Sequence, residues 1–185
     1  MLSFLVSEPR FCGAFLWLLF MRMRWWALTL SLISGFEGVR QVAYLDPVGV
    51  PTICFGHTQG VMLGDTKTLE ECHDLLAEEA EYFAEVVYYS TEYRLSDEEY
   101  AAYVSFTYNV GAANWRSSTL LILLSSGQRL EACHQLPRWV YAKGIRLPGL
   151  VKRREQERDL CIKGALALQY NALQAPQSRM FRRYP

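Results

Sequence analysis

Glu37, Asp46 and Thr52 lie close together in the segment EGVRQVAYLDPVGVPTICFGHT, which begins at Glu37. Cleavage of a glycosidic bond needs one carboxylic acid that protonates the leaving oxygen and a second carboxylate that acts on the other side of the sugar ring. Glu37 ends an apolar helical pattern and Asp46 lies in a polar turn, and carboxyl groups in unlike environments can divide the acid and base roles. Thr52 opens the returning strand, where its hydroxyl could share a water molecule with Asp46. The alternative is that all three are ordinary surface residues, since Asp before Pro is a common turn former.

The elements that must position these residues are a helix and a β-hairpin. Trp26, Leu30, Ile33 and Glu37 recur at helical spacing, which predicts a first helix with one face toward the core. Apolar residues on both sides of the turn sequence DPVGVP predict a small β-hairpin directly after this helix.

The rest of the chain shows helical patterns. TLEE at Thr68 and SDEE at Ser96 are capping boxes, which predict helices that run to about residue 89 and to Gly111. The segment SSTLLILLSSG is apolar nearly all round and predicts the central buried helix. Further helices are expected at about 130–136 and 149–168. A small sheet lobe followed by a mostly helical lobe is an α+β fold.

Composition bounds the number of domains and the class of partner. The 185 residues suffice for one domain with an extension. Nineteen basic and nineteen acidic residues cancel, so we expect no nucleic-acid partner. The run KRREQER from Lys152 is typical of a solvated, salt-bridged helix face. The cluster RMFRRY from Arg179 is either similarly solvated or a contact to anionic cell-surface polymers.

The five cysteines include no C-x-x-C pair, and the neighbouring histidines fit no standard zinc spacing, so neither a zinc site nor a thioredoxin-type site is expected. Four of them, Cys54, Cys72, Cys133 and Cys161, fall in the predicted globular part. They permit two disulfides in an oxidising compartment, and the sequence leaves the pairing open.

The N-terminal region contains two apolar runs separated by MRMR. Each run is shorter than the roughly 20 residues that a membrane-spanning helix needs, and Arg22 and Arg24 disfavour a stable anchor. No A-x-A-like cleavage site follows. Two interpretations remain: Phe11 to Phe20 is an export signal that the bilayer holds weakly, or translation starts at Met21 or Met23.

The spacing E-x8-D-x5-T followed by GHT resembles the signature of phage-type lysozymes, the muramidases that bacteriophages use as endolysins. YNVGAANWRSSTLL from Tyr108 and GLVKRREQERDLC from Gly149 resemble two later motifs of that family, in the same order. The resemblance implies a lysozyme-like α+β fold, with a small β-hairpin lobe and a larger helical lobe. It also implies hydrolysis of the β-1,4 bond between N-acetylmuramic acid and N-acetylglucosamine in peptidoglycan, which leads to lysis of the host cell.

The resemblance also assigns roles to residues. Glu37 would be the proton donor, Asp46 the carboxylate that supports the attacking water, and Thr52 the hydroxyl that positions this water, in an inverting reaction without a metal or organic cofactor. His57 matches a structural histidine of the family. Four further residues match positions in the family's sugar cleft, namely Thr58, Tyr108, Asn109 and Ser118; the alternative for Tyr108 is core packing and for Ser118 helix capping.

The extension resembles the signal-anchor segment of a branch of these endolysins that is exported, held inactive at the inner membrane and then released into the periplasm. It implies a division into residues 1–24, a candidate export signal-anchor, residues 25–168, a lysozyme-like catalytic domain, and residues 169–185, a basic tail. The cysteines resemble those of the same branch, which gives the hypothesis that Cys54 pairs with Cys72 and Cys133 with Cys161. Cys12 is the odd cysteine, and a thiol there could exchange with Cys54 and so switch activity.

Two competing functions can be distinguished from a muramidase. A lytic transglycosylase cuts the same bond with one glutamate and no activated water, which the presence of Asp46 and Thr52 disfavours. A non-catalytic protein could instead bind the cell wall or permeabilise membranes through its apolar and basic ends, which the presence of all three catalytic residue types disfavours. We therefore expect a monomeric enzyme that acts on peptidoglycan at the cell wall, with transient association of its N-terminus with the inner membrane.

Overall fold

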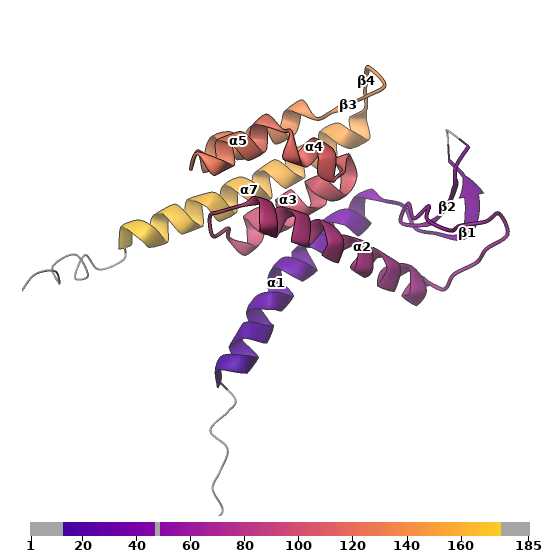
Figure 1. The fold of residues 1–185 in the computed structure, drawn as a ribbon, viewed down its shortest axis with the longest axis horizontal. Coiled ribbons are helices and arrows are strands. Elements are labelled where there is room, and N and C mark those ends of the chain that lie inside the picture. The colour runs from indigo at the N-terminus through magenta and orange to yellow at the C-terminus, as the bar shows by residue number, and fades with distance from the viewer. Residues whose placement is uncertain (1–12, 47–48, 175–185) are drawn as a thin grey trace, which may run out of the picture.

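The computed structural model describes residues 13–46 and 49–174, the side chains of 13–23 excepted. Figure 1 shows a small β-hairpin lobe beside a larger helical lobe, which confirms the predicted α+β fold. The elements in chain order are α1 (Gly13–Phe36), β1 (Arg40–Leu45), β2 (Pro51–Cys54), α2 (Leu69–Ser90), α3 (Asp97–Val110), α4 (Ala112–Arg116), α5 (Thr119–Ser125), α6 (Arg129–Cys133), the 3-10 helix η1 (Leu136–Arg138), β3 (Tyr141–Ala142), β4 (Ile145–Arg146) and α7 (Pro148–Gln174).

Helix α1 ends where the two lobes meet (Figure 1), and Glu37 is the residue that follows it. Ile33 is fully buried, and Trp26 and Leu30 pack against the same cluster, so the predicted core-facing helix is confirmed. At Arg24, Nη2 donates to Glu98 Oε1 of α3 at 2.5 Å, which ties α1 to the helical lobe. Across the described residues, the structure contains no helix with the length and apolar character that crossing a membrane requires.

The predicted β-hairpin is formed by the antiparallel strands β1 and β2, with Tyr44 opposite Thr52 and an irregular register toward Arg40. Asp46 closes the turn: its N–H donates to the Val50 carbonyl at 3.0 Å, and its Oδ1 accepts from the Val50 N–H at 2.8 Å. Gly49 has φ +84°, a backbone conformation that favours glycine. The hairpin is therefore fixed by its own turn residues.

Both predicted capping boxes are present. The Thr68 hydroxyl accepts from the Glu71 N–H at the start of α2, and Ser96 and Glu99 repeat the arrangement at the start of α3. Gly111 ends α3 with φ +86°, as expected of a residue that stops a helix by positive φ. Local sequence thus determines where α2 and α3 begin.

The centre of the helical lobe is α3, whose residues Ala101 to Thr107 are all buried. The prediction that the SSTLLILLSSG segment forms the central helix is wrong. Helix α5 buries Leu120 and Leu124, but Ile122 is 66% exposed, so α5 lies at the edge of the lobe. Apolar composition alone did not indicate which helix the others would surround.

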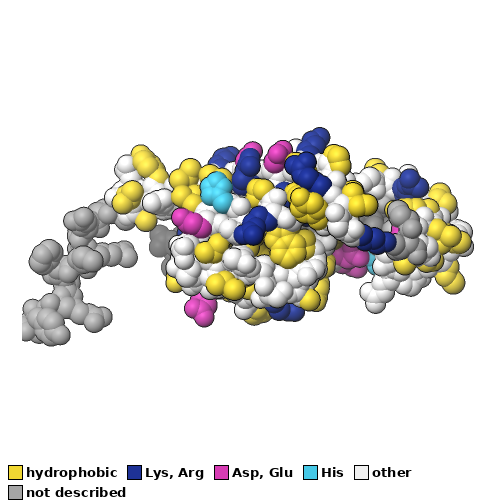
Figure 2. All heavy atoms as spheres, turned by 90° about the horizontal axis from the view of Figure 1, so that it is seen from above, with side chains coloured by type: hydrophobic (Ala, Val, Ile, Leu, Met, Phe, Trp, Pro, Cys, Tyr) yellow, Lys and Arg dark blue, Asp and Glu magenta, His cyan; other side chains and the backbone are white. Residues whose placement is uncertain are grey.

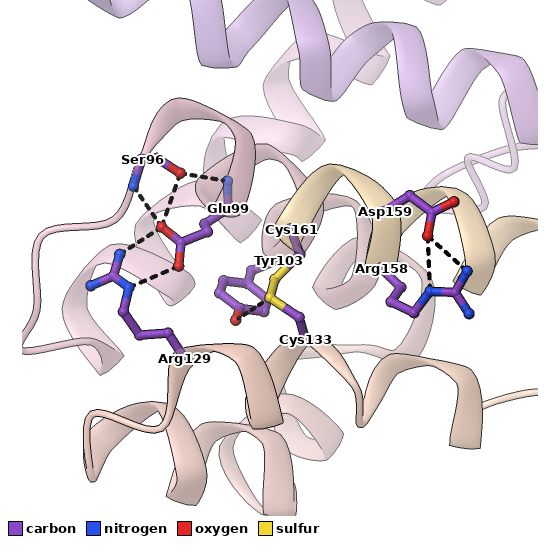
Figure 3. Close-up of a disulfide and its surroundings, with 8 residues drawn as sticks. All are labelled: Ser96, Glu99, Tyr103, Arg129, Cys133, Arg158, Asp159 and Cys161. Carbon is purple, nitrogen blue, oxygen red and sulfur yellow. Dashed lines mark hydrogen bonds and ion pairs between the residues drawn. A yellow bond between two sulfur atoms is a disulfide. The ribbon is translucent and has the colours of Figure 1, made fainter. Parts of the chain in front are cut away.

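Two disulfides connect elements that are distant in sequence. Cys54 pairs with Cys72, which joins the hairpin lobe to α2, and Cys133 pairs with Cys161, which joins α6 to α7. Both hypothesised pairings are confirmed. Figure 3 shows the second disulfide beside the Tyr103 hydroxyl. Cys12 lies outside the described residues, as does the tail from residue 175.

Helix α7 packs along α3, and Gly164 lies at the closest approach. A Cβ on this glycine would come within 2.8 Å of the Glu98 Cβ and 2.9 Å of the Glu99 nitrogen. Glu99 is fully buried and accepts from Arg129 Nε at 3.0 Å and Nη2 at 2.5 Å (Figure 3). Helix α7 continues to Gln174, beyond the expected end near residue 168.

Candidate active site

A hollow of about 690 Å³ lies where the hairpin lobe meets α2 and α3. Glu37 is in its wall, and so are Tyr108 and Asn109 of the predicted sugar-binding set. The other lining residues are Phe55, Gly56, His57, Gln59, Leu75, Glu78, Glu79, Tyr82 and Phe83. The fold thus brings the predicted proton donor together with two predicted binding residues that lie far from it in sequence.

Glu37 is the first residue after α1, and its N–H still donates to the Ile33 carbonyl at 3.0 Å. Its Oε1 accepts from Arg153 Nη1 at 2.6 Å, while 30% of its side chain remains exposed. A carboxyl group that is fixed by a helix end and by a guanidinium, and is still reached by solvent, can exchange a proton with a ligand in the hollow.

Arg153 is itself fixed from three sides. Its Nη1 bonds Glu37, its Nε donates to Glu157 Oε1 at 3.1 Å, and its Nη2 donates to the Ser105 carbonyl at 3.1 Å. The Arg153 side chain is 3% exposed and that of Glu157 is fully buried. The Ser105 hydroxyl donates to Glu157 at 2.7 Å. The buried carboxylate of Glu157 needs such partners. The cluster that results holds Arg153 in place, and Arg153 in turn holds Glu37.

The prediction that the KRREQER run forms a solvated face is wrong at these positions. Arg153, Arg154 and Glu157 are buried, and it is their mutual ion pairs that allow this. Arg154 Nη1 donates to Glu157 at 2.5 Å, and its Nη2 bonds the side-chain oxygen of Asn109 in the wall of the hollow. Burial lowers the pKa of Arg154 to about 10, against the opposing effect of Glu157.

The wall formed by the hairpin lobe and α2 contains a second polar cluster. His57 Nδ1 lies 2.6 Å from Glu79 Oε1, and His57 Nε2 lies 2.9 Å from the Gln59 carbonyl. The Tyr108 hydroxyl donates to Glu79 Oε2 at 3.0 Å and to the Phe55 carbonyl at 3.3 Å. Burial raises the pKa of Tyr108, and the neighbouring Glu79 raises it further, so the hydroxyl stays a donor. Bonds at both ring nitrogens agree with the structural role expected of His57.

Asp46 and Thr52 are not among the residues that line the hollow. Asp46 lies in the hairpin turn, where it bonds Val50, and Thr52 lies on β2 opposite Tyr44. Thr52 is 4% exposed, and its hydroxyl donates to the Val50 carbonyl at 3.0 Å. Thr58 is exposed and lies outside the lining set. Ser118 is buried as the N-cap of α5, where its hydroxyl accepts from the Leu121 N–H at 3.1 Å. Its position is that of a helix cap, the alternative recognised from the sequence.

Sequence reasoning missed the polar residues that support the site. Glu79 stands in the run AEEAEYF, where no local pattern separates it from its neighbours. The motif around Arg153 was visible in the sequence, but the partners of Arg153 include Glu37, directly after α1, and the Ser105 carbonyl of α3. Among the described residues, no group of three or more His, Cys, Asp or Glu is placed to hold a metal ion.

Comparison with known proteins identifies the family of the chain. The family model for phage lysozyme matches residues 34–157, a span that begins just before Glu37 and ends at Glu157. The chain belongs to the phage lysozyme family. It is 44% identical over 132 residues to the SAR-endolysin of bacteriophage PS119, which covers 71% of this chain and 79% of that protein.

Solved structures of muramidases and endolysins share the fold. The muramidase domain of SpmX from Asticaccaulis excentricus superposes with a TM-score of 0.68 at 30% identity, over 72% of this chain and 94% of that one. The active form of the P1 phage endolysin Lyz gives a TM-score of 0.71 at 25% identity, over 83% of this chain and 95% of that one. As a phage lysozyme, the chain is a glycoside hydrolase of the endolysin type, whose substrate is peptidoglycan.

Proposed function

We propose that this phage lysozyme hydrolyses the β-1,4 bond between N-acetylmuramic acid and N-acetylglucosamine with inversion of configuration. The observation that carries the proposal is the position of Glu37, which lies in the wall of the hollow, partly exposed and paired with a buried arginine. Glu37 donates its proton to the leaving oxygen. Arg153, at 2.6 Å, then stabilises the negative charge that Glu37 acquires.

Asp46 and Thr52 complete the reaction in this proposal. Asp46 accepts a proton from the attacking water, and the oxygen of Thr52, whose hydroxyl already donates to Val50, accepts a hydrogen bond from that water. Asp46 directly follows β1 and Thr52 lies on β2, and both bond the backbone of Val50, which supports a shared task. An inverting reaction needs the two carboxyl groups roughly 6.5–9.5 Å apart, so that the water fits between Asp46 and the sugar.

The test compares wild type with Glu37→Gln and Asp46→Asn on purified peptidoglycan, at equal concentrations of folded protein. We expect both variants to lose orders of magnitude in the rate of turbidity loss. Full activity of either variant would contradict the role given to that residue. The anomeric configuration of the first-formed product, followed by NMR before mutarotation, tests inversion.

Two other functions, a lytic transglycosylase and a membrane-permeabilising protein, can be distinguished from a muramidase by related measurements. Hydrolysis adds a water to the released muropeptides, whereas a lytic transglycosylase leaves an anhydro-sugar end, and mass spectrometry distinguishes the two. Killing of cells by Glu37→Gln would indicate direct membrane action instead.

We further propose that residues 1–24 export the monomeric enzyme and hold it at the inner membrane before it acts in the host periplasm, with the catalytic domain at residues 25–168 and a basic tail at 169–185. Three observations support this: the apolar N-terminal sequence, the disulfides typical of an oxidising compartment, and the SAR-endolysin relatives. Fractionation of cells before and after collapse of the membrane potential tests it. We expect the enzyme in the membrane fraction before collapse and in the periplasm afterwards, and a cytosolic enzyme would contradict the proposal.

A further inference from the structure

Helix α2 and the connection to α3 expose four tyrosines. Tyr82, Tyr88, Tyr89 and Tyr93 are 55%, 66%, 80% and 46% exposed. Among the described residues, none of their hydroxyls makes a hydrogen bond, whereas the partly buried Tyr100 donates to the Ala84 carbonyl at 2.6 Å. Several large aromatic side chains gathered on one exposed surface are a feature of binding sites.

These tyrosines lie along a row of hollows that begins at the active site. Tyr82 lines the active-site hollow and also a second one of about 250 Å³. The second shares Glu85 and Tyr89 with a third of about 370 Å³, and the third shares Tyr88 and Tyr89 with a fourth of about 610 Å³, which ends at Tyr93. Tyr82 and Tyr89 are separated by seven residues of helix, a rise of about 10 Å. A polymer that leaves the active site past Tyr82 would therefore follow this row.

The charges along the row favour a neutral, hydroxyl-rich ligand. Carboxylates border the third hollow at Glu81 and Glu85 and the fourth at Glu92 and Asp97. They outnumber the basic side chains of the row, which are Arg116 at the second hollow and Arg94 at the fourth. Carboxylates accept hydrogen bonds from sugar hydroxyl and amide groups, and aromatic rings pack against the apolar faces of sugar rings. The same acidic side chains would be repelled by an anionic phospholipid surface. On the face shown in Figure 2, apolar, basic and acidic side chains are intermixed over the helical lobe.

We propose that Tyr88, Tyr89 and Tyr93, together with Glu85, form a tyrosine track that binds the glycan strand of peptidoglycan outside the catalytic hollow. This inference rests on the proposed function, because it takes the same polymer as the ligand of both sites. The strand lies along α2 and passes Tyr82 into the hollow that contains Glu37. The track holds the enzyme on insoluble cell wall through contacts that are separate from the catalytic residues.

The test is cosedimentation with purified sacculi, using Glu37→Gln as the background so that the wall is not cleaved during the measurement. We expect the Tyr88→Ala/Tyr89→Ala pair to weaken binding about tenfold, the effect of losing contacts of hot-spot size. Tyr170→Ala is the matched control, since Tyr170 is 62% exposed on α7 but lines none of the four hollows. Equal binding by the tyrosine pair and its parent would overturn the proposal.

Four further measurements keep this test independent of folding and of catalysis. Unchanged thermal unfolding of the variants shows that they are folded. Tyr93→Ala, in the connection between α2 and α3, tests the track if the Tyr88→Ala/Tyr89→Ala pair unfolds.

In NMR titrations with a soluble hexamer of N-acetylglucosamine we expect shifts of the Tyr88 and Tyr89 ring signals, and the absence of shifts at saturation would count against the track. If the Tyr88→Ala/Tyr89→Ala pair lost binding to anionic phospholipid vesicles but kept its binding to sacculi, the ligand of the track would be a membrane surface and the proposal would be refuted. Lysis by Glu37→Gln alone would refute the catalytic proposal and leave the sacculus-binding result interpretable.

Discussion

Replacement of Arg153 by methionine tests whether the buried ion-pair cluster supports the active site. The substitution keeps much of the apolar stem but removes the guanidinium that bonds Glu37, Glu157 and the Ser105 carbonyl. Glu157, fully buried, keeps only Arg154 and the Ser105 hydroxyl. Removing one partner of a buried ion pair costs about 3–5 kcal/mol. The contact to Glu37 adds little to this, because that side chain is 30% exposed and solvent screens it.

We therefore expect Arg153→Met to lower the free energy of unfolding by about 3–5 kcal/mol, which for a chain of this size lowers Tm by about 6–20 °C. Urea unfolding with intact disulfides, followed by tryptophan fluorescence and by circular dichroism, measures the change. The matched control is Arg158→Met on the same helix. Arg158 is 31% exposed and pairs with its neighbour Asp159, itself 67% exposed (Figure 3), so its loss should change stability by no more than about 0.5 kcal/mol.

The activity of the folded fraction gives a second readout. With Arg153 absent, Glu37 loses the contact that orients its carboxyl, so lysis by Arg153→Met should fall even at low temperature, where the protein remains folded. The supporting role of the cluster is refuted if Arg153→Met lowers the free energy of unfolding by less than about 1 kcal/mol, or if Arg158→Met lowers it by as much as Arg153→Met does. Full lytic activity of Arg153→Met would show that Glu37 is oriented by other contacts.

Three further predictions concern the packing, covalent bonds and titration of the fold. Gly164→Ala should destabilise the protein by about 1–3 kcal/mol in urea unfolding because its Cβ meets α3, whereas Gly35→Ala, with nothing within 4 Å, should not destabilise it; equal effects would contradict the close approach of α7. Replacing Cys133 and Cys161 together by alanine should lower the unfolding free energy by about 2–5 kcal/mol, since the bond closes a loop of sequence separation 28; unchanged thermal unfolding would count against the pairing. Burial raises the pKa of Tyr103 and Tyr108 above the ordinary value of 10.0, so their contribution to stability is present in full below about pH 10 and is lost as the pH rises further; Tyr103→Phe should reduce this alkaline loss in pH-dependent unfolding, and an unaltered pH profile would contradict it.

The local elements were predictable because their signals are short in range. The capping boxes at Thr68 and Ser96 satisfy helix N–H groups within three residues, and Gly111 stops α3 through its own φ. The hairpin follows from the Asp46 turn, in which Asp46 bonds the backbone of Gly49 and Val50, three and four residues on. The position of Glu37 at the end of a core-facing helix required only the apolar periodicity of that helix.

The burial of the site's supporting residues was not predictable in the same way. An alternation of Arg and Glu predicts a solvated helix face unless partners from other parts of the fold replace water. For Arg153 those partners are Glu37 and the Ser105 carbonyl. Nor does the sequence of the α5 segment indicate that α3 occupies the centre of the lobe.

The sequence by itself determined the capped helices and the hairpin, because each depends on groups only a few positions apart. It also contained, in order, the motifs that resemble a phage lysozyme. The tertiary structure decided that Glu37 lies against Arg153, that Asn109 is held by Arg154, and that Ser118 caps a helix rather than lining the hollow. These outcomes depend on which buried charges can find partners after α1, α3 and α7 have packed, since a buried charge without a partner is too costly to keep.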